Sequence, residues 1–301
     1  MMDIRDNISI RCNDVRVWFQ DIGPKLAQEL LDGNYDKNRS LRKTYVAQLA
    51  KVMSDGRFDS LNGQTVLIDS SNRLFNGQHR MNAIVESGVT LPFLVVQSDH
   101  AVESYKTIDT GTKRLVADAL RDMPNAPTVA SVARPICCMD WGSTPLASCI
   151  QGKFTVNHMA VDSALVVDYA HAHYDEIMRI VHLTDRVRKV LGVPIRAIGT
   201  AFWLIDKCNE VSMLDEFVDE LAKPAPDSKT VTAFKTYIIK AHGDRSRKPN
   251  YSMTVGMLLN GYERFIEMDE STAMFNKHRM WFDRYDKRLE AYRARKAQGG
   301  E

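Results

Sequence analysis

The stretch LFNGQHRMNA, at residues 74–83, places a glycine, an amide, an imidazole and a guanidinium side by side. Its apolar pair, Leu74 and Phe75, predicts a short strand, and the Asn-Gly pair that follows predicts a tight turn. From Gln78 the pattern becomes helical. The first amides of a helix have no partners within it and carry the positive end of its dipole, and a glycine there lets a phosphate approach the backbone. The stretch therefore predicts a phosphate-binding turn.

Three side chains in the first turn of this predicted helix could act on a phosphate ligand. Arg80 can offer a planar fork of donors to phosphate oxygens. His79 can donate to a phosphate or transfer a proton near neutral pH, and Gln78 can hydrogen-bond a base, a sugar hydroxyl or a metal-bound water. The plainer alternative is a cap, in which Asn76 closes the helix start and Arg80 pairs with a neighbouring acid.

A second basic turn, DTGTKR at residues 109–114, favours the ligand-binding alternative. It again puts a glycine and capping hydroxyls ahead of basic residues at a predicted helix start. Two such helix starts in one small domain predict one shared anionic ligand. The residues of this turn that we expect to bind phosphate are Thr110, Gly111, Lys113 and Arg114.

Two further residues join the predicted site. Asp109 could hold a divalent cation, orient His79 or simply cap its own turn, and these alternatives stay open. Arg39 lies just before a predicted helix start at Ser40, which makes it a third basic contact. We expect any catalysis to depend on His79, Arg80 and Asp109. The predicted phosphate-binding set is Asn76, Gly77, Gln78, His79 and Arg80, with the second turn and Arg39.

The order of predicted elements indicates two domains. Strand and helix patterns alternate in residues 1–125, which predicts an α+β domain, and helical patterns dominate residues 126–301. The expected strands of the first domain are at 8–10, 15–19, 65–69, 74–75 and 91–98, and its expected helices are at 24–31, from Ser40 to Gly56, and at 78–87, 99–107 and 115–123. The expected helices of the second domain are at 128–141, 155–184, 193–208, 212–222, 229–242, 252–268 and 271–297.

The composition is that of an ordinary soluble globular protein, with 44% hydrophobic and 26% charged residues and a net charge of +2. This near balance predicts no general attraction to nucleic acid or to an anionic membrane, so any such role needs a local patch. The charged N-terminus does not resemble a signal peptide, and no apolar run is long enough to cross a membrane. We therefore expect a cytoplasmic protein without a membrane partner.

Two other features predict structural roles. The five cysteines lack the spacing of disulfide or zinc motifs, so we interpret them as small buried residues and predict no metal site formed by them. The tail from Lys277 to Glu301 holds eight basic and four acidic residues and predicts a solvated terminal helix, with a nucleic-acid or partner contact as the alternative. The helical domain could also mediate a homodimer.

The run NGQHRMNA resembles the GxxRxxA box of the ParB/sulfiredoxin superfamily, and it closely resembles the DGQHR variant of DndB-like and phage-encoded ParB-like proteins. The flanking strand, turn, helix and apolar strand LPFLVV fit the same layout. Two further stretches, NRSLRKTYVAQLAKVMSDGRF and IDTGTKRLVADAL, look like other signatures of the phage group. The resemblance covers about residues 10 to 125, and it implies a bacteriophage or mobile-element origin and the cytoplasm of a host cell.

The superfamily implies a nucleotide pocket in which the box and its helix start hold a triphosphate. Residue by residue, Gly77, His79 and Arg80 match that phosphate-binding turn. Sulfiredoxin has a cysteine directly before its His-Arg pair, where this chain has Gln78, so thiol phosphoryl chemistry is excluded. ParB has a helix-turn-helix after its box, which we do not recognise here. Asn76 replaces the aspartate of DGQHR, which argues against a nuclease.

Three functions follow as hypotheses. The first is binding of ATP or CTP with Mg²⁺, with possible phosphoryl transfer or hydrolysis in DNA metabolism or modification. The second is a DNA-binding regulator of the DndB type that contacts backbone phosphates without catalysis. The third, a metal-dependent nuclease, ranks last because the sequence shows no clustered carboxylates.

Overall fold

The fold is known from a computed structural model, which describes residues 10–12, 15–102, 115–142, 146, 155–156, 159–244, 246, 248–268 and 278–298. The chain forms two compact units, Met1–Lys113 and Arg114–Glu301. The division lies earlier than the expected boundary after residue 125. The reason is packing: Leu120 and Met123 belong to the hydrophobic core of the second unit.

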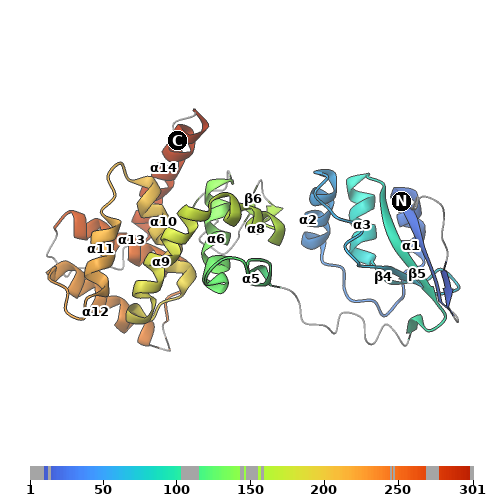
Figure 1. The fold of residues 1–301 in the computed structure, drawn as a ribbon, viewed down its shortest axis with the longest axis horizontal. Helices are drawn as coiled ribbons and strands as arrows, with labels where there is room; N and C mark the ends of the chain where they lie inside the picture. The colour runs from blue at the N-terminus through green and yellow to red at the C-terminus, as the bar shows by residue number, and fades with distance from the viewer. Residues whose placement is uncertain are drawn as a thin grey trace. The chain divides into compact units, whose positions relative to one another are not determined.

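The N-terminal unit is an α+β domain, as expected (Figure 1). It contains strands β1 (Ile10–Cys12), β2 (Val15–Ile22), β3 (Val66–Ile68), β4 (Leu74–Asn76) and β5 (Leu91–Ser98), and helices α1 (Pro24–Asp32), α2 (Lys43–Ser54) and α3 (Gln78–Ser87). Among the described residues, the strands form one mixed sheet in the order β1-β2-β5-β3-β4. β5 pairs with β2 antiparallel and with β3 parallel. The chain connects β3 to β5 through β4 and α3. Because β4 lies at the edge of the sheet, α3 begins at this edge.

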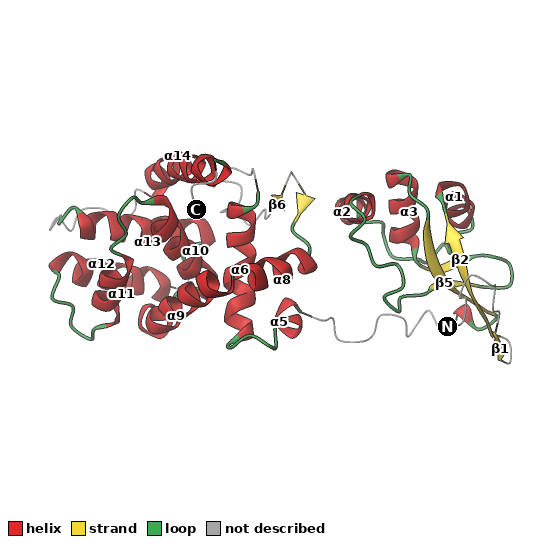
Figure 2. Ribbon diagram, turned by 45° about the horizontal axis from the view of Figure 1, so that its top comes forward, coloured by secondary structure: helices red, strands yellow, loops and turns green. Residues whose placement is uncertain are grey.

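Helices α1, α2 and α3 pack as a row with α3 in the middle, against one face of the sheet (Figure 2). The core between the layers includes Val66, Met81 and Phe93, all fully buried. Alternate residues of a strand face opposite sides, and Leu67 accordingly joins a smaller cluster with Phe75 on the other face. The elements that carry LFNGQHRMNA therefore contribute buried side chains to both clusters, Leu74 and Met81 to one and Phe75 to the other.

Helix α2 differs from its expected start and its expected buried face. It begins at Lys43 after Arg42, not at a cap formed by Ser40, and no side chain caps it. Leu41 and Tyr45, expected to be buried, are 41% and 45% exposed, whereas Val46 is buried. The apolar side that the sequence predicts for this helix, Leu41, Tyr45, Leu49, Val52 and Met53, is thus buried only in its later part, where Met53 is buried and Leu49 packs against the core.

The C-terminal unit is mostly helical, as expected, with one short hairpin that the sequence did not predict (Figure 1). Its elements are α5 (Val116–Ala119), α6 (Ala126–Asp140), β6 (Thr155–Val156), β7 (Met159–Ala160), α8 (Ser163–Ala172), α9 (Tyr174–Leu191), α10 (Ile195–Cys208), α11 (Leu214–Ala222), α12 (Lys229–Gly243), α13 (Tyr251–Ile266) and α14 (His278–Ala297). The single helix expected over residues 155–184 is thus replaced by the hairpin, α8 and the first part of α9.

Helix α10 is the centre of this unit, since it packs against α6, α9, α13 and α14. Close approach of the helices depends on glycine. A Cβ placed on Gly199 of α10 would lie 2.6 Å from a methyl group of Val132 in α6. A Cβ on Gly261 of α13 would lie 2.8 Å from the ring of Phe234 in α12. Cys137, Cys138 and Cys208 are buried in this unit and form no disulfide among the described residues.

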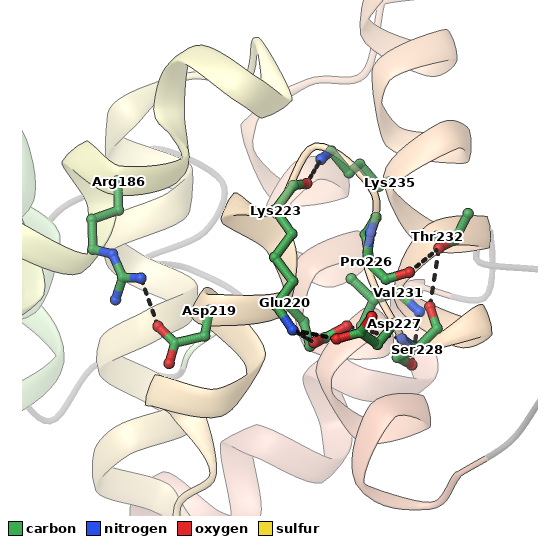
Figure 3. Close-up of polar contacts among 10 residues, drawn as sticks. All are labelled: Arg186, Asp219, Glu220, Lys223, Pro226, Asp227, Ser228, Val231, Thr232 and Lys235. Atoms are coloured by element: carbon green, nitrogen blue, oxygen red, sulfur yellow. Dashed lines mark hydrogen bonds and ion pairs between the residues drawn. The ribbon is translucent and has the colours of Figure 1, made fainter.

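Polar contacts order the connection between α11 and α12 (Figure 3). Ser228 caps α12 by accepting from the amide of Val231, and its own amide donates to Glu220. Lys223 pairs with Glu220 and, at 2.6 Å, with Asp227. Each contact is local or partly exposed, so the connection has a structural explanation without a ligand.

Helix α14 is not a solvated tail on all sides. Tyr285 and Leu289 are fully buried, and two buried carboxylates on other helices receive its basic side chains. Lys296 Nζ lies 2.7 Å from both oxygens of Asp140 in α6. Arg288 Nη1 lies 2.5 Å from Glu263 of α13. Much of the positive charge of the tail therefore holds the helix in place.

No helix in the described part of the chain combines the length and apolar character needed to cross a membrane.

Candidate functional site

The turn between β4 and α3 has the geometry that the Asn-Gly pair predicted. Gly77 has φ 115° and ψ 0°, which favours glycine, and it is the N-cap residue of α3. No side chain caps the helix. The side-chain amide of Asn76 donates instead to the backbone carbonyl oxygen of Thr65, at 3.2 Å. The capping role considered for Asn76 is therefore not the one observed, and the N-cap residue Gly77 has no side chain with which to cap α3.

Arg80 is buried, with 7% of its surface exposed. Its Nη1 donates to the carbonyl oxygen of Gln64 at 2.9 Å, and its Nη2 donates to that of Thr65 at 2.7 Å. The guanidinium also lies over the ring of Phe93, 5.8 Å from its centre. The donor fork therefore holds the segment that leads into β3.

Gln78 is 8% exposed and holds a different segment. Its Nε2 donates to the carbonyl oxygen of Arg39 at 2.6 Å, and its Oε1 accepts from Asn34 at 3.4 Å. Asn38 continues the contact, because its side chain bonds Asn34 and, at 2.8 Å, the carbonyl oxygen of Leu74. The segment after α1 is thereby fastened to β4 and to the start of α3.

His79 joins the starts of α2 and α3. Its Nε2 accepts a hydrogen bond from the backbone amide of Arg42, the N-cap residue of α2, at 3.1 Å. The ring also lies near Tyr45, at 5.5 Å between ring centres. Since Nε2 accepts, the neutral ring carries its proton on Nδ1. Nδ1 is buried and has no hydrogen-bond partner among the residues that the structure describes.

The surroundings keep this imidazole neutral. Burial lowers the pKa of His79 below its ordinary value of 6.5, because it disfavours the charged ring, and the nearby positive charges of Arg39 and Arg42 lower it further. A neutral ring is required for the contact to the Arg42 amide, since a protonated Nε2 cannot accept.

We call residues 37–43, KNRSLRK, the basic turn. Its backbone is held at two points, by Gln78 at Arg39 and by His79 at Arg42. The side chains of Arg39, Arg42 and Lys43 are exposed. The first turns of α2 and α3, both within the described residues, contain no acidic side chain. This part of the unit therefore exposes positive charge at the start of α2, next to the start of α3, where Gly77 to Arg80 are buried.

The structure brings part of the predicted site together. Asn76 to Arg80 and Arg39 meet around the starts of α2 and α3, as described above. Asp109, Thr110, Gly111, Lys113 and Arg114 lie outside the described residues, so their place in the site stays a prediction.

The site prediction lacked Arg42 and Lys43, which stand at the start of α2. The signal was present, since four of the seven residues in KNRSLRK are basic. It was missed because the helix was expected to start at Ser40, which would have placed these residues inside the helix.

The donor set suits an anion better than a metal ion. It consists of guanidinium, ammonium and amide groups. In the part of the chain that the structure describes, no three His, Cys, Asp or Glu side chains are grouped so as to hold a metal ion. Mg²⁺ accompanying a nucleotide would therefore be held by its phosphate oxygens at these turns.

Comparisons of the chain with protein-family models, with curated proteins and with solved structures find no significant match.

Proposed function

We propose that the N-terminal unit binds the phosphate groups of a nucleotide, ATP or CTP with Mg²⁺, at the starts of α2 and α3. One observation carries the proposal: the hydrogen bond from Arg42 to His79 holds two helix starts together beside an exposed basic turn. Helix starts favour negative charge through their free amides and their dipoles. The resemblance of NGQHR to a phosphate-binding box supports the same ligand.

In this proposal the roles within the box are divided. Gly77, with its positive φ, forms the turn from β4 into α3, and Arg39, Arg42 and Lys43 supply the positive charge. Arg80 contributes through the carbonyl groups that it holds. The geometry supports binding better than catalysis, because the Nε2 atom of His79 is occupied and its Nδ1 atom is buried.

A specific observation favours a second candidate, DNA binding. The charged side chains of the basic turn are exposed, and the exposed Tyr45 follows them on α2. Exposed basic side chains suit the regularly spaced phosphates of a nucleic-acid backbone, and an exposed aromatic ring can stack on an unpaired base.

The test compares the two ligands on the full chain. Binding of labelled ATP and CTP with Mg²⁺, and of a short labelled DNA duplex, is measured for the unaltered protein and for the combined variant Arg39→Ala, Arg42→Ala and Lys43→Ala. We expect the variant to lose about tenfold or more in affinity, since each charged contact contributes about 1.5–3 kcal/mol. The control is Arg16→Ala, which removes an exposed charge from β2 of the same unit.

The outcomes separate the candidates. A steep loss of affinity with rising salt and no response to nucleotides favours DNA, since each phosphate contact releases counterions. Binding of a nucleotide with Mg²⁺ by the unaltered protein, without binding of the duplex, favours the first proposal. If neither ligand binds the unaltered protein, both are wrong.

A further inference from the structure

The side chains of Gln78 and His79 hydrogen-bond the backbone of the basic turn at two points three residues apart. We infer that both are positioning residues, which hold the basic turn in the conformation that presents Arg39 and Arg42 to a phosphate-bearing ligand. The inference rests on the proposed function. It adds to that function the way in which Gln78 and His79 of the NGQHR stretch support ligand binding.

The two contacts fix the turn in a complementary way. Gln78 donates to the carbonyl oxygen of Arg39, and His79 accepts from the amide of Arg42. One holds an acceptor of the turn and the other holds a donor, so the direction of the backbone between them is defined. Ordering one residue costs about 1–2 kcal/mol in conformational entropy. A turn ordered before binding spares the ligand that cost, which raises affinity.

The buried Nδ1 atom of His79 is the second observation. An imidazole with an unpaired proton is unfavourable in a protein interior, where an apolar side chain would pack without this loss. What the ring supplies in return is the Nε2 acceptor for the Arg42 amide. His79 is 6% exposed and its ring lies against the start of α2, so its polar contact acts on the proposed ligand-binding turn.

Protonation of His79 is expected to release the turn. A protonated Nε2 is a hydrogen-bond donor and would face the donor N–H group of Arg42. The hydrogen bond between them would then be lost. The charged and titratable groups that face the ring are Arg39 and Arg42 of the basic turn and Tyr45 of α2. The two arginines oppose the positive charge of a protonated ring. Ligand affinity should therefore fall as the pH decreases through the pKa of His79, which lies below the ordinary value of 6.5.

The experiment uses two substitutions of one residue in the full chain. His79→Leu fills the space but cannot accept a hydrogen bond. His79→Gln offers an amide oxygen near the position of Nε2 and does not titrate. Binding of labelled ATP, labelled CTP and a short labelled DNA duplex is measured across pH, together with amide hydrogen exchange of peptides that cover residues 37–45.

We expect His79→Leu to bind about tenfold more weakly, because one hydrogen bond contributes about 1 kcal/mol and the turn also loses its order. Its amides in the basic turn should exchange faster. His79→Gln should restore binding and exchange protection, and its affinity should no longer fall on acidification below pH 6.5 as that of the unaltered protein does. Titration of the ligand phosphates is common to all variants and cancels in the comparison.

The matched control is His242→Gln in the C-terminal unit. His242 is also buried, bonds a neighbour through Nε2 and has an Nδ1 atom without a described partner. This variant should bind like the unaltered protein. Unchanged binding by His79→Leu, or an unchanged pH profile in His79→Gln, overturns the positioning role while the proposed function stands. No binding by the unaltered protein overturns the proposed function, and the positioning role with it.

Discussion

The Nη2 atom of Arg80 donates a hydrogen bond to the carbonyl oxygen of Thr65 at 2.7 Å, and the neighbouring Nη1 reaches that of Gln64 at 2.9 Å. The arginine of the box thus acts on the segment before β3, while Gln78 and His79 act on the basic turn. Three successive side chains of α3 fasten two separate segments to the start of one helix.

Replacing Arg80 should therefore destabilise the N-terminal unit. We expect Arg80→Ala to lower its free energy of unfolding by about 2–4 kcal/mol, because two carbonyl groups lose their donors and a buried side chain leaves a cavity. The free energy of unfolding is measured in a urea titration, in which hydrogen exchange of peptides from α3 detects the unfolding of this unit. Arg80→Lys should recover part of the loss, since an ammonium group cannot reproduce the planar fork. Full stability combined with lost ligand binding would instead place Arg80 in direct contact with phosphate.

Substitution of Gly77 should be costly for conformational reasons. A Cβ there would lie 3.5 Å from a methyl group of Val66, an ordinary contact, so the penalty comes from φ 115°. We expect Gly77→Ala to lower stability by about 1–2 kcal/mol. Thermal unfolding measures the change. The control is Gly243→Ala, at the end of α12, where no atom lies within 4 Å of an added Cβ and stability should be unchanged or higher.

Stability should decrease as the pH falls below the ordinary histidine pKa of 6.5. Burial lowers the pKa of His79, and burial followed by the charge of Lys248 lowers that of His242. The unfolded chain then binds more protons than the folded chain between the ordinary and the lowered values, so acidification through this range favours unfolding. Urea midpoints measured from about pH 8 to about pH 5 should show the loss.

Glutamine variants identify the histidine responsible in each unit. His79→Gln should flatten the pH dependence of unfolding of the N-terminal unit, and His242→Gln should flatten that of the C-terminal unit. A slope unaffected by either substitution would assign the effect to other groups.

The ion pair between Lys296 and Asp140 should anchor α14. Asp140 also accepts from the hydroxyl groups of Tyr169 and Tyr292, and Nε2 of His173 lies 4.0 Å from it, so removing the lysine takes away the nearest cation of a buried carboxylate. We expect Lys296→Met to lower the free energy of unfolding of the C-terminal unit by about 1–3 kcal/mol.

Two further variants test this pairing. Asp140→Asn combined with Lys296→Met should cost less than the sum of the single changes, because the two groups interact. Lys287→Met, an exposed position of the same helix, should change stability by less than about 0.5 kcal/mol. Additive losses for the pair would mean that the contact contributes little.

Local signals in the sequence determined several elements of the N-terminal unit. The apolar run LPFLVVQS became β5, and the helix expected at 78–87 begins and ends where predicted, after Gly77 and before Gly88. Both glycines have positive φ, a preference that belongs to the residue itself and can be read without knowledge of the fold. Most helices of the C-terminal unit follow in the same way from apolar periodicity.

Roles that depend on residues far apart in sequence were decided by the tertiary structure. Arg80 has as its partners the carbonyl groups that precede β3, which the pairing of β3 with β5 brings to α3. The start of α2 depends on His79, which lies 37 residues further along the chain. Likewise, the basic residues of α14 meet carboxylates from α6 and α13 only when the helices pack.

For LFNGQHRMNA, the sequence by itself determined the turn and the helix, because glycine conformation and helical periodicity are local properties. Only the tertiary structure decided what each side chain does there, because a donor or acceptor acts on whichever partner the fold brings within hydrogen-bond distance.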